Sequence, residues 1–186
     1  MQGKPLTLPE SIDFMTSSFD PLHARDSVSA RQIPLPWPLT MVVTWFGAGL
    51  SPVVPGTMGS LAALPFAWVI ATLGAPWMLV PAGVAVFLIG WWASDVYCRL
   101  AGLKDPGRIV IDEVAAQWIT LSVAPPELVP YLVGFVLFRI FDMLKPWPIS
   151  WADRRVSGGF GVMIDDILAA GFSTPLLWLF LIFLWT

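Results

Sequence analysis

Long apolar segments constrain this chain more than any other feature of its sequence. Five of them occupy residues 61–73, 77–93, 114–124, 128–144 and 167–185, and only the fourth holds charged residues. Charged residues make up 12% of the chain, whereas they make up about a quarter of a typical soluble domain. A segment inside a bilayer must satisfy its own backbone hydrogen bonds, which favours helices. The sequence therefore predicts an all-α fold, a polytopic membrane helix bundle.

The lengths of these segments set the expected number of membrane helices. A full crossing needs about 20 residues, so segments 61–73 and 114–124 are short for one, and we predict about four to five membrane-embedded helices. An earlier apolar stretch, 39–50, is also too short to span. It leads into residues 51–60, where two prolines and two glycines predict a loop. We therefore expect a re-entrant or interfacial element at the start of the membrane region.

The N-terminal part of the chain has a different character. Residues 1–36 are polar and show no periodic apolar face. We predict a disordered tail over 1–36 and a membrane-embedded domain over 37–186. His23, the single histidine of the chain, lies in this tail, so histidine-based phosphotransfer is not expected.

Basic residues give the predicted orientation. The tail and the segments 94–113 and 145–166 carry lysine and arginine, whereas the turns at 74–76 and 125–127 carry neither. Because basic loops stay in the cytoplasm, we predict a cytoplasmic N-terminus and an external C-terminus. The acidic residues fall on the same cytoplasmic side, apart from Glu127, and are Asp95, Asp105, Asp112, Glu113, Asp142, Asp153, Asp165 and Asp166.

Absent patterns narrow the chemistry. The chain has no clustered basic patch, so nucleic acid is not an expected partner. Cys98 is the only cysteine, which excludes an intramolecular disulfide and a zinc pattern of paired cysteines. There is no GxxxxGK[ST] loop, no cysteine-x5-arginine pattern and no DxDx[TV] element. Metal-assisted chemistry with carboxylate ligands remains.

Acidic residues at the ends of apolar segments are the strongest chemical signal. Such residues at helix N-termini can cap the backbone, which is an alternative for each one singly. Capping does not explain Asp142, near the C-terminal end of its segment, where Arg139 three residues earlier can pair with it. Neighbouring carboxylates repel unless a cation or a proton separates them. We therefore predict an oxygen-ligated, Mg²⁺-like site at Asp112, Glu113, Asp142, Asp165 and Asp166.

Two further segments favour phosphate binding. In residues 51–60, glycine amides and the hydroxyls of Thr57 and Ser60 precede a predicted helix, and helix N-termini attract phosphate. The alternative is a turn in which serine caps the helix. Arg139 and Lys145 flank Asp142 at a spacing of three on one helix face, so both can bind phosphate. The alternative is a helix end with cations that reach toward the interface.

These motifs together resemble one known family. The pattern GxGLSPxxPGTxGS at 47–60, the acid pair Asp112-Glu113, the segment 138–148 and the pattern DDxxA at 165–169 resemble phosphatidylglycerophosphatase A, in that family's order. The resemblance covers about residues 37–171. One departure is Ala115-Ala116, where family members often have glycine, and alanine is still small enough for close helix packing.

The resemblance implies a phospholipid-biosynthesis enzyme of the bacterial inner membrane. Its Mg²⁺-dependent reaction would convert phosphatidylglycerophosphate to phosphatidylglycerol and inorganic phosphate at the cytoplasmic face. The five carboxylates would supply Mg²⁺ ligands, with a general-base or nucleophile role open to each of them. Asp95 and Asp153 would support them. The predicted phosphate-binding residues are Thr57, Ser60, Arg139 and Lys145.

Three other readings stay open from sequence alone. A small ion- or proton-coupled transporter would also use acids within membrane helices, but it is expected to place them near the midplane rather than at segment ends. A membrane phosphotransferase acting on a nucleotide-activated lipid would show several aspartates on consecutive helical turns, and that pattern is absent. A structural scaffold protein would leave the grouping of the acids unexplained.

Overall fold

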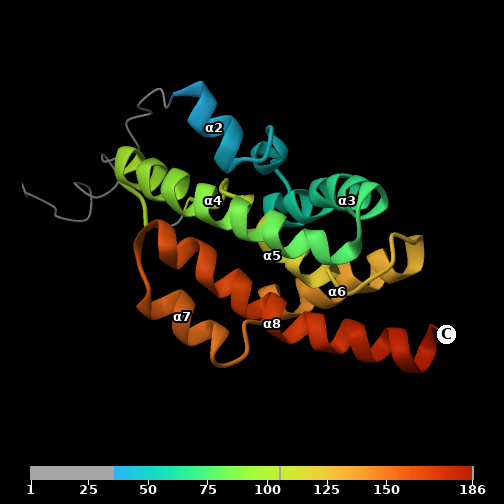
Figure 1. Cartoon of the computed structure of the whole chain (residues 1–186). Coiled ribbons are helices and arrows are strands. Elements are labelled where there is room, and N and C mark those ends of the chain that lie inside the picture. Colours follow the sequence, from blue (N-terminus) through green and yellow to red (C-terminus); the bar gives the residue numbers. More distant parts are fainter. Residues whose placement is uncertain (1–35, 105, 186) are drawn as a thin grey trace, which may run out of the picture. The chain divides into compact units, whose positions relative to one another are not determined.

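The computed structural model describes residues 36–104 and 106–185, and every regular element in this part is helical. The predicted all-α fold is therefore confirmed. The predicted disordered tail lies outside the described residues except for Pro36, and so does Asp105. The elements in chain order are α2 (Trp37–Val43), η1 (Ala48–Leu50), α3 (Pro55–Leu73), η2 (Pro76–Met78), α4 (Leu79–Ala101), α5 (Ile111–Leu121), α6 (Leu128–Leu144), α7 (Ile149–Arg155) and α8 (Gly158–Leu184) (Figure 1).

Three of the described helices are long and apolar enough to cross a membrane. They are α3 with 19 residues, η2 and α4 together with 26, and α8 with 27. Helix α6 has 17 residues, at the lower limit for a crossing. Helix α5 has 11 residues, or about 16 Å of helix against a hydrocarbon thickness of about 30 Å. The bundle thus combines complete spans with one short helix. The expected short element before α3 is present as α2 and η1.

The outer surface of the bundle is apolar, as contact with lipid requires. Exposed leucine, isoleucine and valine side chains cover α3, α4 and α8. Exposed tryptophans stand toward both ends: Trp92, Trp147 and Trp151 on the side of the acidic residues, and Trp77 at the opposite turn. Tryptophan is enriched at the two interfaces of a bilayer. The surface therefore fits a membrane protein whose acidic end lies at one interface.

Helix α5 is the centre of the packing. It contacts α3, α4, α6 and α8, and most of its residues are buried. Small residues let its neighbours come close: a Cβ at Gly134 of α6 would stand 2.7 Å from a methyl group of Leu121. Ala115 and Ala116 are fully buried, so alanine is small enough for the close packing expected at these positions.

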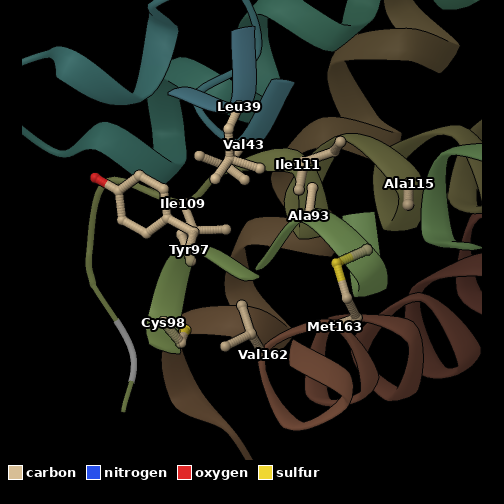
Figure 2. Packing of buried hydrophobic residues seen from close by; sticks show 10 residues of the cluster. All are labelled: Leu39, Val43, Ala93, Tyr97, Cys98, Ile109, Ile111, Ala115, Val162 and Met163. Carbon is tan, nitrogen blue, oxygen red and sulfur yellow. The ribbon is translucent and has the colours of Figure 1, made fainter. Parts of the chain in front are cut away.

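A buried hydrophobic cluster fixes the start of α5 against α8 (Figure 2). Val43 of α2, Ala93 of α4, Ile111 of α5 and Met163 of α8 all belong to it. Ile111 directly precedes Asp112, and Met163 stands two residues before Asp165. The cluster therefore sets the positions of acidic residues on two helices that are far apart in the sequence.

Several predicted helix boundaries were wrong. Helix α3 begins at Pro55 rather than after residue 60, so Thr57 and Ser60 lie in its first two turns. Proline suits the first position of a helix because its fixed φ is helical and its missing N–H would be unpaired there.

The two later boundary errors have one cause. Helix α8 begins at Gly158, so Asp165 and Asp166 lie two turns inside it rather than at its start. Helix α4 runs on to Ala101, so Asp95 lies within it rather than at its end. Acidic residues suggest helix ends because charges rarely enter a span, but Asp165 and Asp166 face the protein interior and Asp95 pairs with Arg99 on its own helix.

Candidate active site

Three carboxylates from two helices converge at one end of the bundle. Asp112 and Glu113 lie in the first turn of α5, and Asp166 lies in α8. One carboxylate oxygen of each lies within 4.8 Å of the others. Asp112 is 9% exposed and Asp166 is 4% exposed. Two buried acids and the largely buried Glu113, whose side chain is 12% exposed, therefore lie close enough together to share one cation.

Several oxygens of this cluster have no partner. Among residues 36–104 and 106–185, Glu113 Oε2, Asp165 Oδ1 and Asp166 Oδ2 are buried and accept no hydrogen bond. A buried carboxylate oxygen without a partner is costly. Hard cations such as Mg²⁺ prefer oxygen ligands from carboxylates. The donor set and its unmet bonding capacity therefore fit a divalent cation.

The pKa of Glu113 also indicates that the cluster favours an added positive charge. Burial is the main cause that raises the pKa of Glu113 to about 8. A hydrogen bond from Asp112 lowers this pKa, the charges of Asp166 and Asp142 raise it, and Arg139 lowers it. Burial, followed by the charge of Glu113, also raises the pKa of Asp112 well above its usual value. The site therefore favours an extra positive charge, which either a proton or a metal ion can supply.

Arg139 links this cluster to α3 and α6. Its Nη1 lies 2.5 Å from Asp142 Oδ2 and 3.8 Å from Glu113 Oε1. The same atom donates a hydrogen bond of 3.5 Å to Ser60 Oγ on α3. The predicted pair between Arg139 and Asp142 is thus present, on adjacent turns of α6. Within the described residues, the buried Nε of Arg139 has no acceptor, so one donor is left for a ligand.

Lys145 forms a second charged group beside the first. It ends α6 with a φ of 42°, and its Nζ lies 2.6 Å from Asp153 Oδ1 and 2.7 Å from Asp165 Oδ2. Burial would lower the pKa of Lys145, but the hydrogen bonds and charges of Asp153 and Asp165 outweigh it and raise the pKa. Lys145 therefore stays protonated, and Asp165 stands in an ion pair rather than with the three converging carboxylates.

The N-terminus of α3 closes the site on a third side. A Cβ at Gly56 would collide with Glu113 Oε1 and would lie 3.3 Å from Arg139 Nη1. Ser60 Oγ donates a hydrogen bond of 3.0 Å to the Gly56 carbonyl. Thr57 stands in the same first turn. The first turn of a helix has free N–H groups and a partial positive charge, so this arrangement can hold an anion next to the carboxylates.

Asp95 has a different place from the other predicted residues. It pairs with Arg99 at 3.1 Å and accepts a hydrogen bond of 3.3 Å from the Gly159 amide. A Cβ at Gly159 would collide with the backbone of α4 at Asp95 and Trp91. Asp95 thus anchors the start of α8 to α4 and supports the site from a distance, whereas Asp153 acts on it through Lys145.

Sequence reasoning missed Gln117. It lies one turn after Glu113 on α5 and is fully buried. In the described part of the chain, neither atom of its amide has a hydrogen-bond partner. The available signal was a polar residue in the middle of the apolar segment 114–124, at helical spacing from Glu113.

Comparisons with known proteins place this chain among a family of relatives. The sequence pattern of the family described as Phosphatidylglycerophosphatase A matches residues 41–181. A protein of Escherichia coli (strain K12) named Phosphatidylglycerophosphatase A is 46% identical over 160 residues, which cover 85% of this chain and 91% of that protein. A protein of the same name from Haemophilus influenzae is 36% identical over 141 residues, covering 75% of this chain and 86% of that protein.

A third relative carries a different name. A protein of Bacteroides thetaiotaomicron named Putative phosphatidylinositol-3-phosphatase is 36% identical over 141 residues, covering 72% of this chain and 87% of that protein. No solved structure matches this chain. The residues that match the family model, 41–181, include every residue of the site described above.

Proposed function

This chain belongs to the phosphatidylglycerophosphatase A family, a family of phosphatases, and we propose that it uses Mg²⁺ to hydrolyse phosphatidylglycerophosphate at the cytoplasmic face of the bacterial inner membrane. The products are phosphatidylglycerol and inorganic phosphate. The observation that carries the proposal is the convergence of Asp112, Glu113 and Asp166 within 4.8 Å, beside Arg139 and the N-terminus of α3.

Asp112, Glu113 and Asp166 are the residues that would hold the cation, because their oxygens converge and two of these oxygens are buried without partners among the described residues. When bound, Mg²⁺ would neutralise the charge of the phosphate and activate a water molecule. Asp142 and Asp165 complete the proposed ligand set from the edge of the cluster. Each is now paired with a basic residue, and each becomes available when that basic residue turns to phosphate.

Arg139 and Lys145 are the proposed phosphate-binding residues, together with Thr57 and Ser60. A phosphate monoester beside several carboxylates needs compensating positive charge. Arg139 offers a planar set of N–H donors, one of which is unpaired in the described structure. Lys145 keeps its charge because its pKa is raised. Both side chains lie where a phosphate would meet the carboxylates.

The reaction needs positioning and charge neutralisation. The phosphorus forms a bond to a water oxygen while its bond to the glycerol oxygen breaks. A carboxylate of the cluster takes a proton from the attacking water and passes it to the leaving glycerol oxygen, so the carboxylate is restored. The uncatalysed barrier for a phosphate monoester is very high. The low exposure of the site excludes bulk water and holds the reacting groups together.

The cytoplasmic orientation is supported by the distribution of basic residues. The described lysines and arginines gather at the acidic end, and they are Arg99, Lys104, Arg108, Arg139, Lys145, Arg154 and Arg155. The turn 125–127, at the opposite ends of α5 and α6, has no basic residue. Basic residues flanking spans favour the cytoplasmic side, and the similar proteins come from bacteria.

The direct test is phosphate release by the detergent-purified chain. We expect release from phosphatidylglycerophosphate with Mg²⁺, loss of release with excess chelator, and recovery when Mg²⁺ is restored. Phosphatidic acid and phosphatidylinositol 3-phosphate serve as comparison substrates, because one similar protein is named for the latter. Folded protein that releases no phosphate under any condition would contradict the proposal and favour the transporter reading.

A further inference from the structure

An apolar groove runs between α3 and α6. It has a volume of about 290 Å³, and one water occupies about 30 Å³ of liquid, so the groove has room for several methylene groups. Its walls include Leu61, Leu64, Pro65 and Trp68 of α3 and Tyr131 and Leu132 of α6. Leu61 is 39% exposed and Leu132 is 45% exposed, so the groove opens toward the lipid side of the bundle.

Two contacts show how the groove lies relative to the site. Ser60 of α3 accepts a hydrogen bond from Arg139 of α6. Trp68 of α3 packs against Tyr131 of α6, with ring centroids 5.2 Å apart. The two contacts are eight residues apart on each helix, at positions 60 and 68 of α3 and at positions 139 and 131 of α6. The residue numbers rise on one helix and fall on the other, so the two helices run antiparallel. Eight residues correspond to about 12 Å of helix. On α3 the groove starts at Leu61, next to Ser60, whereas its α6 wall consists of Leu132, Tyr131 and Leu128 and starts seven residues from Arg139, deeper in the bilayer region.

We propose that this groove binds the upper part of one acyl chain of the lipid substrate. The inference rests on the proposed function, because it needs a lipid whose terminal phosphate lies beside Arg139. In phosphatidylglycerophosphate, a glycerol, a diester phosphate and a second glycerol separate the terminal phosphate from the acyl chains. A substrate held at the carboxylates therefore places its acyl chains deeper along α3 and α6, where the walls are apolar.

A second apolar groove, of about 160 Å³, is a weaker place for the chain. It is lined by Met41 and Val42 of α2, by Trp45 and Phe46 after α2, by Val86 and Ile89 of α4 and by Ile111 at the start of α5. Its walls come from helices that carry none of the proposed phosphate-binding residues. Helices α3 and α6, in contrast, carry Ser60 and Arg139, and the groove begins directly after Ser60 on α3 and about two turns below Arg139 on α6. The continuity of site and groove on the same two helices selects the α3–α6 groove.

The test compares the kinetics of groove variants on the complete lipid substrate with their kinetics on the headgroup of that lipid alone. Leu132→Trp and Leu64→Trp each place a large ring in the groove, and Leu88→Trp places one on a lipid-exposed position of α4, outside the groove. The substrates are dioleoyl phosphatidylglycerophosphate in mixed micelles and the water-soluble glycerophosphoglycerophosphate obtained by removing both acyl chains. Circular dichroism and thermal unfolding in detergent check that each variant is folded.

We expect the groove variants to raise the KM for the lipid about tenfold, the factor for two displaced methylene groups. Their kcat/KM for the headgroup, and both constants of Leu88→Trp, stay at wild-type values. An unchanged lipid KM overturns the inference, as does an equal loss on both substrates or an equal effect of Leu88→Trp. Wild-type protein inactive on both substrates contradicts the proposed function itself, so the two failures are distinguishable.

Discussion

Two levels of the α5–α8 interface contain buried polar side chains, and they differ in how these side chains are satisfied. At the upper level, Glu113 and Asp166 have buried oxygens that accept no hydrogen bond within the described residues. Seven residues farther along each helix, Thr120 Oγ1 and Ser173 Oγ lie 2.8 Å apart and are hydrogen-bonded. Because both helices run in the same direction, the two levels are about 10 Å apart.

The difference separates a structural polar contact from a binding site. A paired hydroxyl contributes about 1 kcal/mol and needs nothing from outside the protein. Unpaired buried carboxylates cost several kcal/mol unless a ligand compensates them. The same pair of helices thus carries a contact that is complete in itself and a cluster whose buried oxygens leave bonding capacity for the proposed cation. Within membrane helices, ionisable groups of the second kind mark function.

Asp166→Asn gives the sharpest contrast between the two levels. It removes a proposed cation ligand, so we expect kcat for phosphatidylglycerophosphate to fall by about 1,000-fold or more. The melting temperature of the metal-free protein stays equal or rises, because one of several mutually repelling buried carboxylates is neutralised. Phosphate release and thermal unfolding in detergent measure the two effects. Activity near that of the wild type would remove Asp166 from the ligand set.

Arg139→Lys tests the phosphate side of the upper level. Lysine keeps the charge but replaces the planar guanidinium, which now reaches Asp142, Glu113 and Ser60, by a single ammonium group. We expect kcat/KM to fall about 100-fold, by analogy with the loss of an oriented donor at a reaction centre.

Arg99→Lys is the matched control for this substitution. Arg99 is also paired with an aspartate, but its side chain is 69% exposed, and exposed ion pairs contribute little. Steady-state kinetics of both variants against the wild type should show a loss in the first and none in the second. Equal kinetics of Arg139→Lys and the wild type would argue against a guanidinium–phosphate contact.

Proton competition is expected at the upper level alone. The pKa of Glu113 is raised to about 8 in the metal-free site, so below that pH a cation must displace a proton. The affinity for Mn²⁺, used as a probe for Mg²⁺, should therefore fall as the pH is lowered, by about tenfold per pH unit for each proton that the cation displaces. Electron paramagnetic resonance of free Mn²⁺ measures this without turnover. A Mn²⁺ affinity that does not change between pH 6 and 8 would contradict this prediction.

The membrane fold and the identity of the acids were predictable because charges are rare in apolar segments. The sequence therefore predicted the helices around α5, α6 and α8 and five candidate carboxylates, of which the structure brings Asp112, Glu113 and Asp166 together. The start of α8 was not predictable, because the glycines at 158, 159 and 161 read as a loop. They form helix here since Gly159 packs against the backbone of α4, where no side chain fits.

The sequence also could not predict which side chains on other helices form ion pairs and hydrogen bonds at the site. Lys145 pairs with Asp165 across 20 positions, and Arg139 meets Ser60 across 79. Such pairs depend on which helices become neighbours, which spacing along one helix does not determine. Sequence spacing did predict the pair between Arg139 and Asp142, because both lie on one helix.

Gly56→Ala tests how closely α3 must approach the upper level. The added methyl group would collide with the carboxylate of Glu113, so either α3 or Glu113 has to shift. We expect about a tenfold loss of kcat/KM, because small displacements at a reaction centre have large effects on rate. Gly171→Ala is the matched control, since a Cβ there meets nothing within 4 Å. The control should keep full activity and gain about 0.5–1 kcal/mol of stability.

Thr120→Val gives the smallest effect and tests the lower level. Valine has nearly the shape of threonine but lacks the hydroxyl that pairs with Ser173. We expect a loss of about 1 kcal/mol in the free energy of unfolding, since one buried hydrogen bond is lost while Ser173 keeps its bond to the Ala170 carbonyl. Activity and Mn²⁺ affinity should stay at wild-type values, as shown by chemical unfolding in detergent beside a phosphate-release assay. A loss of Mn²⁺ affinity would mean that the cation site extends to the lower level, and the contrast between a self-satisfied contact and a ligand-dependent cluster would then fail.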